Sequence, residues 1–308
     1  MPKHLANRLS HALVGAALAA GAVTAGTGAA QAAPQSVPAV SPAVSPAVPS
    51  AVPSAVSAPA VRAPAAYLVD ATTGQVQFSK QADLRRPVAS ITKVMTAYTV
   101  LKQAKPTDEV EVTPADVRYA SKGGASIAYL RAGDRLTVKD LLYALMLPSG
   151  ADAAHALART YGPGVDTFVD KMNATARELG MKDTLYVNAD GMPTYGGGYS
   201  TARDQVRLAQ AALDDATIKK ITSTRYHSVP QTAEHRAYSW QNTNRLLGTE
   251  GAIGVKTGHT RAAGYTLAFA ADRDGDRLVG VILGETSSSR RFESAQALLD
   301  WAAASRQR

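Results

Sequence analysis

Alternating apolar and polar residues predict β-strands in two parts of the chain. Tyr67–Asp70 and Gln75–Phe78 lie on either side of a glycine-containing turn, which is the pattern of a hairpin. Tyr265–Ala271 and Arg277–Leu283 show the same pattern around a short acidic turn. Ile253–Lys256, just before this second pair, also alternates. The sequence therefore predicts strands at both ends of its globular part.

Between about residues 90 and 220 the pattern is helical. Val138–Leu147 is one such segment, because it follows a capping box formed by Thr137 and Asp140 and ends at Pro148. Leu298–Trp301 belongs to a predicted terminal helix. Strands at both ends with helices between them indicate an α+β fold, in which an antiparallel sheet is flanked by helices and joined to a mainly helical subdomain. We expect the functional site in the cleft between the two.

Composition divides the chain into three regions. Residues 1–32 combine a basic start, a short run of small apolar residues and a small-x-small site ending at Ala32, which predicts a cleavable secretory signal peptide and an extracytoplasmic location. Residues 33–64 are almost wholly Ala, Pro, Val and Ser and predict an extended linker. Residues 65–308 have the composition of a globular catalytic domain.

Charge and cysteine content narrow the function. The formal net charge is +8, and cleavage after Ala32 removes two basic residues and no acid, leaving +8 minus 2, or +6. This balance suits work near an anionic cell wall, peripheral to the membrane at most, and no aromatic-interleaved basic stripe indicates nucleic-acid binding. Without cysteines there are no disulfides or thiolate metal sites, and the acidic turn Asp272–Asp276 lacks calcium-loop spacing. We expect neither metal nor cofactor.

Ser90 and Lys93 are the candidate nucleophile and base. A serine hydroxyl needs a base held against it to attack a carbonyl at neutral pH. If Ser90 opens a helix, Lys93 lies three residues along the same face and can be that base. The helix N-terminus then offers free N–H groups to a developing oxyanion. The spacing is also typical of an ordinary amphipathic helix with a solvent-directed lysine, so it does not decide the chemistry alone.

Two further segments support this chemistry. Lys256-Thr257-Gly258 continues the alternating run Ile253–Lys256, and an edge strand there can pair with an extended peptide while its ammonium and hydroxyl meet a terminal carboxylate. Ser149 follows Pro148 on a loop between predicted helices, where its hydroxyl can pass a proton to a leaving amine. A simple turn before the next helix is the alternative for Ser149.

Ser90-x-x-Lys93, Ser149-Gly150-Ala151 and Lys256-Thr257-Gly258 occur in the order of the joint signature of penicillin-binding proteins and serine β-lactamases. Several longer blocks are similar too; these are Arg86–Ala97, Leu179-Gly180-Met181 with Asn188, Ser200–Asp204, Asn242–Leu247 and Gly254–Gly264. The chain therefore resembles the serine-type D-alanyl-D-alanine carboxypeptidases, low-molecular-mass penicillin-binding proteins of peptidase family S11. Ala151 departs from the family, which usually has Asn there, so the contacts of that amide are absent or come from elsewhere.

The resemblance implies a mechanism and partners. Ser90 attacks the bond between the terminal D-alanines of a peptidoglycan stem peptide, and β-lactams acylate the same serine. Lys93 is kept neutral by desolvation and by the positive charge of Lys256. The N–H groups of His259 and Ser90 form the oxyanion hole, while the His259 imidazole lines the groove. Arg291 is a weaker candidate for the substrate carboxylate, with an exposed helix-start arginine as the alternative.

Three alternatives stay open from the sequence. The acceptor of the acyl group is water in a carboxypeptidase or an amine in a transpeptidase. A class A β-lactamase needs a glutamate to activate water, and Glu178 is the acid that tempts this role, without a supporting Asn. The third alternative is a catalytically impaired protein that binds wall peptide, which Ala151 motivates.

Overall fold

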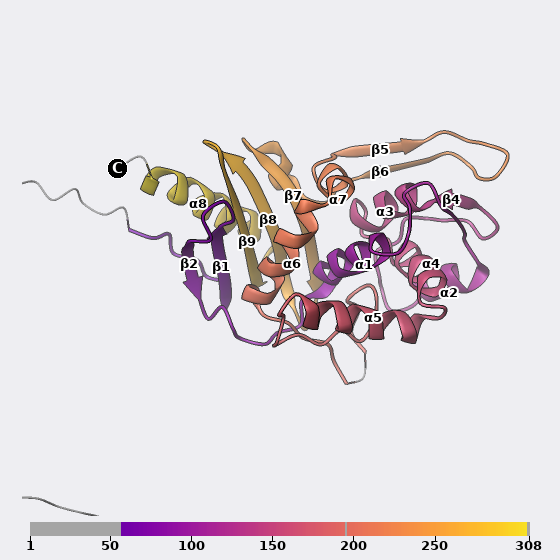
Figure 1. The fold of residues 1–308 in the computed structure, drawn as a ribbon, viewed down its shortest axis with the longest axis horizontal. Helices are drawn as coiled ribbons and strands as arrows, with labels where there is room; N and C mark the ends of the chain where they lie inside the picture. Colours follow the sequence, from indigo (N-terminus) through magenta and orange to yellow (C-terminus); the bar gives the residue numbers. More distant parts are fainter. Residues whose placement is uncertain (1–56, 195, 307–308) are drawn as a thin grey trace, which may run out of the picture. The chain divides into compact units, whose positions relative to one another are not determined.

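The computed structural model describes residues 57–194 and 196–306, so the predicted signal peptide and most of the predicted linker lie outside the described residues. A five-stranded antiparallel sheet has the strand order β2-β1-β9-β8-β7 (Figure 1). Its strands are β1 (Ala65–Asp70), β2 (Val76–Lys80), β7 (Ala252–Thr260), β8 (Gly264–Arg273) and β9 (Asp276–Glu285). Both predicted hairpins and the predicted strand before the second are confirmed, and β7 lies at an edge of the sheet.

Strands β1, β8 and β9 send alternate residues to two separate cores, as the two-residue period of a strand requires. On β8, Leu267 and Phe269 pack with the terminal helix α8 (Ser288–Arg306), while Ala268 and Ala270 belong to the core shared with the other helices. The α+β fold is confirmed: α8 covers one face and α6 (Ala202–Asp214) the other. Burial on both faces explains why these strands are almost continuously apolar.

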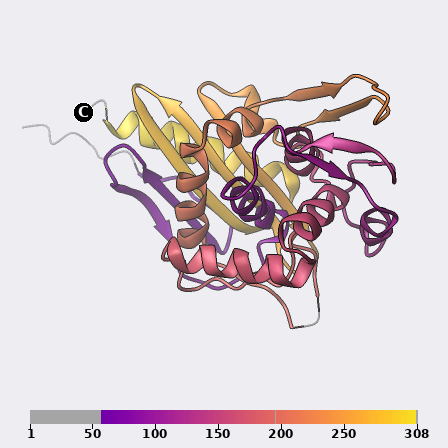
Figure 2. The same cartoon turned by 45° about the vertical axis from the view of Figure 1, so that its right-hand side comes forward.

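The remaining helices gather on the side of the sheet opposite to α8 (Figure 2). They are α1 (Thr92–Leu101), α2 (Pro114–Ala120), α3 (Val138–Met146), α4 (Ala151–Tyr161), α5 (Val165–Glu178) and α7 (Ala216–Thr222). Helix α3 begins at the predicted cap, where the Thr137 side chain accepts a hydrogen bond from the Asp140 N–H. Two short 3-10 turns complete the chain: η1 (Ala89–Ile91) precedes α1, and η2 (Arg245–Gly248) directly precedes β7.

Two small antiparallel pairs of strands extend the helical part and were not predicted. They are β3 (Glu109–Glu111) with β4 (Arg135–Thr137), and β5 (Tyr226–Val229) with β6 (Tyr238–Gln241). The second pair reaches back to the helical part, where the Trp240 indole N–H donates to the carbonyl of Ala128 at 2.9 Å. Runs of three or four residues are too short for a sequence pattern to separate them from loops.

The chain is already packed before the first strand begins. Val61 and Ala63, within the segment predicted as linker, are buried in the core beneath α8. The Ala63 N–H donates to Glu285 at 3.2 Å, and Lys80 donates to the carbonyl of Val61 at 2.7 Å. These contacts tie the entering chain to the sheet.

Among the helices that the structure describes, none is both long and apolar enough to cross a membrane.

Candidate active site

Ser90 and Lys93 meet as the motif predicts. Ser90 lies in the 3-10 turn η1, which runs directly into α1, so the prediction that Ser90 itself opens an α-helix is off by one short turn. The Lys93 amine lies 3.1 Å from the Ser90 hydroxyl oxygen and donates to the carbonyl of Asp190 at 2.7 Å. Because the second bond uses one amine hydrogen, a neutral Lys93 can direct its lone pair at the serine proton.

The backbone just before Ser90 is strained. Ala89 has a φ of 53°, in the left-handed region that residues with a Cβ rarely adopt. Gly191 lies against it so closely that a methyl group at position 191 would overlap the Ala89 carbonyl. Such strain persists when the surrounding structure holds it, and it gathers at functional sites. Here it turns Ser90 toward Lys93 at the start of α1.

Burial controls the two amines of the site. Lys93 and Lys256 are each 1% exposed, although long charged side chains are rarely buried. Burial lowers the pKa of Lys93 to about 8. The nearby carboxylates of Asp190 and Asp152 oppose this effect, because they favour the charged form of the amine. Burial, the charge of Lys93 and that of Arg291 lower the pKa of Lys256 well below its usual range. A pKa near 8 leaves roughly a tenth of Lys93 neutral at pH 7.

Strand β7 brings Lys256, Thr257 and Gly258 against the serine. A methyl group at Gly258 would overlap the Thr266 hydroxyl and lie 3.0 Å from the Ser90 nitrogen, so a side chain there would push β7 away from η1. The Thr257 hydroxyl lies 2.7 Å from that of Thr243, which sequence reasoning missed as an individual residue. The Thr243 N–H also donates to Leu147, just before Ser149. Thr243 thus links the edge strand to the helical part.

Ser149 and Ala151 adjoin this arrangement. Ser149 has a φ of 69°, and its buried hydroxyl has no hydrogen-bond partner among the described residues. An unpaired buried hydroxyl is costly, so this atom is ready to bond a group that enters the site. Ala151 begins α4 and is fully buried, and its N–H donates to Ser126 at 2.8 Å. The loop that contains Ser126 therefore covers a small alanine side chain at the position where the family usually has an asparagine.

Asp152 explains how that loop is held. Its buried carboxylate accepts hydrogen bonds from the N–H groups of Ala128, Leu130 and Ala153. The sequence points to Asp152 through its place directly after the Ser149 motif, but its partners lie 22 to 24 residues earlier in the chain. Asp152 is therefore a residue that positions the loop over Ser149, and sequence reasoning did not assign it this role.

His259 and Arg291 occupy different places. The His259 imidazole is exposed and stacked on Tyr265, with ring centres 4.1 Å apart, as expected for a groove-lining residue. Arg291 is 8% exposed, so the alternative of an ordinary exposed arginine is wrong. Its guanidinium donates to the carbonyls of Gly258 and Thr266 at 2.8 and 3.3 Å. Arg291 thus holds the backbone of β7 at Gly258 and adds positive charge near Lys256.

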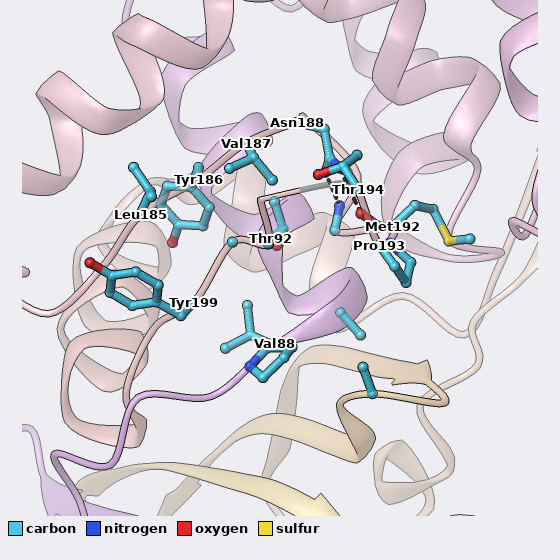
Figure 3. A pocket seen from close by; sticks show the side chains of 16 residues that line it. Val88, Thr92, Leu185, Tyr186, Val187, Asn188, Met192, Pro193, Thr194 and Tyr199 are labelled. Carbon is cyan, nitrogen blue, oxygen red and sulfur yellow. Dashed lines mark hydrogen bonds between the residues drawn. The ribbon is translucent and has the colours of Figure 1, made fainter.

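A mostly apolar pocket of about 160 Å³ adjoins the site. Figure 3 shows Tyr186 and Tyr199 on one side of it and Met192 on the other, with Val88 of the segment before Ser90 between them. Ser90, Lys93 and Lys256 are not among its lining residues. The pocket therefore lies beside the reacting groups, along the start of η1.

Residues 52–287 match the family model described as D-alanyl-D-alanine carboxypeptidase. The chain belongs to this family. It is 39% identical over 256 residues to a D-alanyl-D-alanine carboxypeptidase of Streptomyces sp. (strain K15), covering 79% of this chain and 88% of the relative. It is 34% identical to D-alanyl-D-alanine carboxypeptidase DacF of Bacillus subtilis (strain 168), covering 79% of this chain and 62% of that longer protein.

Solved structures of family members have the same fold. The crystal structure of the Streptomyces K15 DD-transpeptidase superposes with a TM-score of 0.77 at 37% identity, covering 81% of this chain and 100% of that one. An evolved putative penicillin-binding protein homolog from Mycobacterium tuberculosis gives a TM-score of 0.75 at 32% identity, covering 82% and 95%. The resemblance stated from the sequence motifs is thereby confirmed.

The position of Glu178 weakens the β-lactamase alternative. Its side chain, at the end of α5, is 61% exposed and forms an ion pair with Lys102 on the surface. Lys102 follows the last residue of α1, at the opposite end of that helix from Ser90 and Lys93. A glutamate that activates a deacylating water has to lie beside the acylated serine, so Glu178 does not fill that role.

Proposed function

We propose that the protein is a serine-type carboxypeptidase that cleaves the terminal D-Ala-D-Ala bond of peptidoglycan stem peptides through an acyl-enzyme on Ser90. The observation that carries the proposal is the buried Lys93 amine 3.1 Å from the Ser90 hydroxyl, beside the free edge of β7. No step of this reaction requires a metal or a cofactor.

Acylation follows from this geometry. Neutral Lys93 takes the proton of Ser90 as its oxygen attacks the carbonyl of the penultimate D-alanine. The N–H groups of Ser90 and His259 then donate hydrogen bonds to the oxyanion. As the C–N bond breaks, the Ser149 hydroxyl gives its proton to the nitrogen of the departing D-alanine and regains one from Lys93, which had taken it from Ser90. Water then hydrolyses the ester. Each of these groups is buried or aligned before the substrate binds, so the side chains have to move little during the reaction.

The substrate carboxylate is recognised by positive charge and a hydroxyl. An extended peptide that pairs with β7 brings its free carboxylate to Lys256 and Thr257, with Arg291 adding charge from beneath. A carboxylate that enters this site favours the charged form of Lys256, since opposite charges nearby stabilise each other. A charged Lys256 in turn favours neutral Lys93. Binding of the correct substrate thereby prepares the base.

The test uses benzylpenicillin and a peptide ending in D-Ala-D-Ala. We expect a single penicilloyl adduct that maps to Ser90, and D-alanine release that Ser90→Ala abolishes. An adduct on another residue, or equal release by the Ser90→Ala variant, would refute the proposal. Absence of release by both proteins, with peptide still bound, would favour the impaired wall-peptide-binding protein.

Hydrolysis and transpeptidation share the acyl-enzyme and differ in what attacks it. Similar proteins from Streptomyces K15 are described as a DD-transpeptidase and as a carboxypeptidase, whereas the family and the Bacillus subtilis relative are described as carboxypeptidases. We therefore propose water as the principal acceptor and test it with glycylglycine. D-Alanine release accompanied mainly by free acid supports hydrolysis, and release accompanied mainly by the amide product would assign transpeptidation.

We further propose that the enzyme works outside the cytoplasm, on the cell-wall side of the membrane, after removal of residues 1–32. The basic start, apolar run and small-x-small site of this segment support the proposal, together with a stem-peptide substrate found in the wall. N-terminal sequencing of the secreted protein should begin at Ala33. Retention of the intact segment in membranes would instead indicate an anchor.

A further inference from the structure

Asp190 lies in a tight turn that contacts Lys93 of α1 and Ala89, the residue just before Ser90. The Asn188 side chain holds this turn: its oxygen accepts from the N–H of Gly191 at 2.7 Å, and its amide donates to the carbonyl of Met192 at 2.7 Å (Figure 3). The turn presents the Asp190 carbonyl to the Lys93 amine at 2.7 Å. The lysine is thereby held beside Ser90 by a carbonyl 97 residues away in the chain.

The Asp190 carboxylate is buried without enough hydrogen bonds to satisfy it. The side chain is 0% exposed, and Oδ1 accepts one bond, from the Met192 N–H at 3.0 Å. Oδ2 has no hydrogen-bond partner of ordinary length among the described residues. Tyr119 of α2 faces it, and burial together with the Asp190 charge raises the pKa of that hydroxyl. A buried carboxylate with so few donors is costly, so its retention calls for a role.

The charges around Lys93 come from three elements. Asp190 lies on the turn, Asp152 on α4 and Lys256 on β7. Asp152 differs from Asp190 because three backbone N–H groups already neutralise much of its charge. The Tyr119 ring also stacks on the His155 ring, with ring centres 4.5 Å apart, and the His155 ring in turn forms a hydrogen bond with Asp116. Asp190 is therefore the least neutralised carboxylate that faces the lysine.

We propose that Asp190 is a positioning residue for Lys93, whose carbonyl aims the amine at Ser90 and whose buried carboxylate tunes the readiness of that amine to accept the serine proton. The inference rests on the proposed roles of Ser90 and Lys93 in acylation. The carboxylate counteracts the burial of Lys93 and so keeps the amine basic enough to remove the serine proton. Tyr119, which interacts with the same carboxylate, moderates that charge.

The test is the pH dependence of acylation by a fluorescent penicillin in Asp190→Asn. Acylation needs neutral Lys93, so its rate rises with pH through the pKa of Lys93, near 8 in the unmodified protein. Removing the negative charge lowers that pKa, and the midpoint of the rise should move to lower pH by about one unit. The plateau rate above pH 9 should fall, because the weaker base removes the serine proton less readily.

Asp204→Asn is the matched control. Asp204 is also buried and also accepts a loop N–H, from Asp183 at 2.9 Å, but it is not among the charges that act on Lys93. We expect it to change stability and leave the midpoint in place. Equal midpoints in Asp190→Asn and the unmodified protein would overturn the inference, as would an equal shift in both variants.

Tyr119→Phe extends the test if Asp190→Asn does not fold. Removing the hydroxyl leaves the Asp190 charge less neutralised, so the midpoint should move to higher pH by about half a unit. An unchanged midpoint would overturn the inference. A different result would refute the proposed function: the unmodified protein would acquire no penicilloyl group on Ser90 at any pH.

Discussion

At the residue scale, the site depends on small side chains as much as on reactive ones. Gly258 and Gly191 let β7 and the Asn188–Met192 turn approach η1 from two sides, each at a distance that a methyl group would prevent. The backbone of Ala89 and Ser90 is thereby held between them. The strain at Ala89 is therefore maintained by close packing on both sides of the turn.

Gly258→Ala should slow acylation without unfolding the protein. The new methyl overlaps the Thr266 hydroxyl and crowds Ser90, so β7 has to move relative to the nucleophile. We expect the acylation rate constant to fall by at least about tenfold, since sub-ångström misplacement of reacting groups is costly. Stopped-flow labelling with a fluorescent penicillin measures it. Gly248→Ala is the control, because its methyl meets the Arg225 side chain at an ordinary 3.4 Å; equal rates in both variants would contradict the prediction.

Sequence reasoning reached the residues that local spacing connects. Ser90 and Lys93 are three positions apart, and Lys256-Thr257-Gly258 are contiguous, so short motifs bring them to notice. Asp190 and Thr243 were not assigned roles because their partners are set by the tertiary fold. Lys93 is 97 residues from Asp190, and no pattern in one sequence encodes that distance. The prediction that desolvation favours neutral Lys93 agrees with its burial, but the sequence did not reveal the two carboxylates, Asp190 and Asp152, that oppose this effect.

At the element scale, loops and short turns carry more of the site than regular helices do. Ser90 lies in η1, Ser149 precedes α4, and the 126–130 segment covers both Gly150 and Ala151. Asp152 of α4 holds that segment through two backbone N–H groups, those of Ala128 and Leu130. The hairpin β5–β6 holds it from the other side through Trp240.

Asp152→Asn should loosen the covering segment. An amide nitrogen cannot accept the hydrogen bonds that one carboxylate oxygen accepted, so at least one buried N–H loses its partner. We expect a loss of about 1–3 kcal/mol in unfolding free energy, measured by urea denaturation. The exposed ion pair of Asp183 with Arg85 provides the comparison, since solvent screens its charges and Asp183→Asn should cost less than Asp152→Asn. Similar losses of unfolding free energy in the two variants would contradict the role of Asp152 in holding the 126–130 segment.

Elements with long or strongly patterned segments were predicted, and short ones were not. The hairpin β8–β9 and helix α3 follow from alternation and capping. The pair β5–β6 was missed because two four-residue strands enclose an eight-residue polar loop. Its stability comes from stacking that sequence patterns do not reveal, with Tyr143 on His227 at 3.6 Å.

At the scale of the molecule, one sheet joins two cores. Its α8 face is closed partly by the segment that precedes β1, through Val61 and Ala63. The composition of residues 33–64 predicted a linker throughout, and most of that segment lies outside the described residues. Its last residues nevertheless pack like the domain that follows, because even an Ala- and Val-rich chain buries apolar surface where a sheet offers it.

Removing this segment should destabilise the whole domain. We compare a chain that starts at Ala58 with one that starts at Ala65. The shorter chain loses the burial of Val61 and Ala63 and the bonds to Glu285 and Lys80, so its unfolding free energy should fall by about 2–3 kcal/mol. The midpoint of urea unfolding measures the difference, and coincident midpoints would show that the domain begins at β1.

The contact between Gly191 and the Ala89 carbonyl restricts which amino acids position 191 can accept. A side chain of any size needs the space that the carbonyl fills, and Gly191 has a φ of 80°, which other residues rarely adopt. A library carrying all twenty amino acids at position 191, sorted for cells that retain fluorescent penicillin, should return glycine codons almost exclusively.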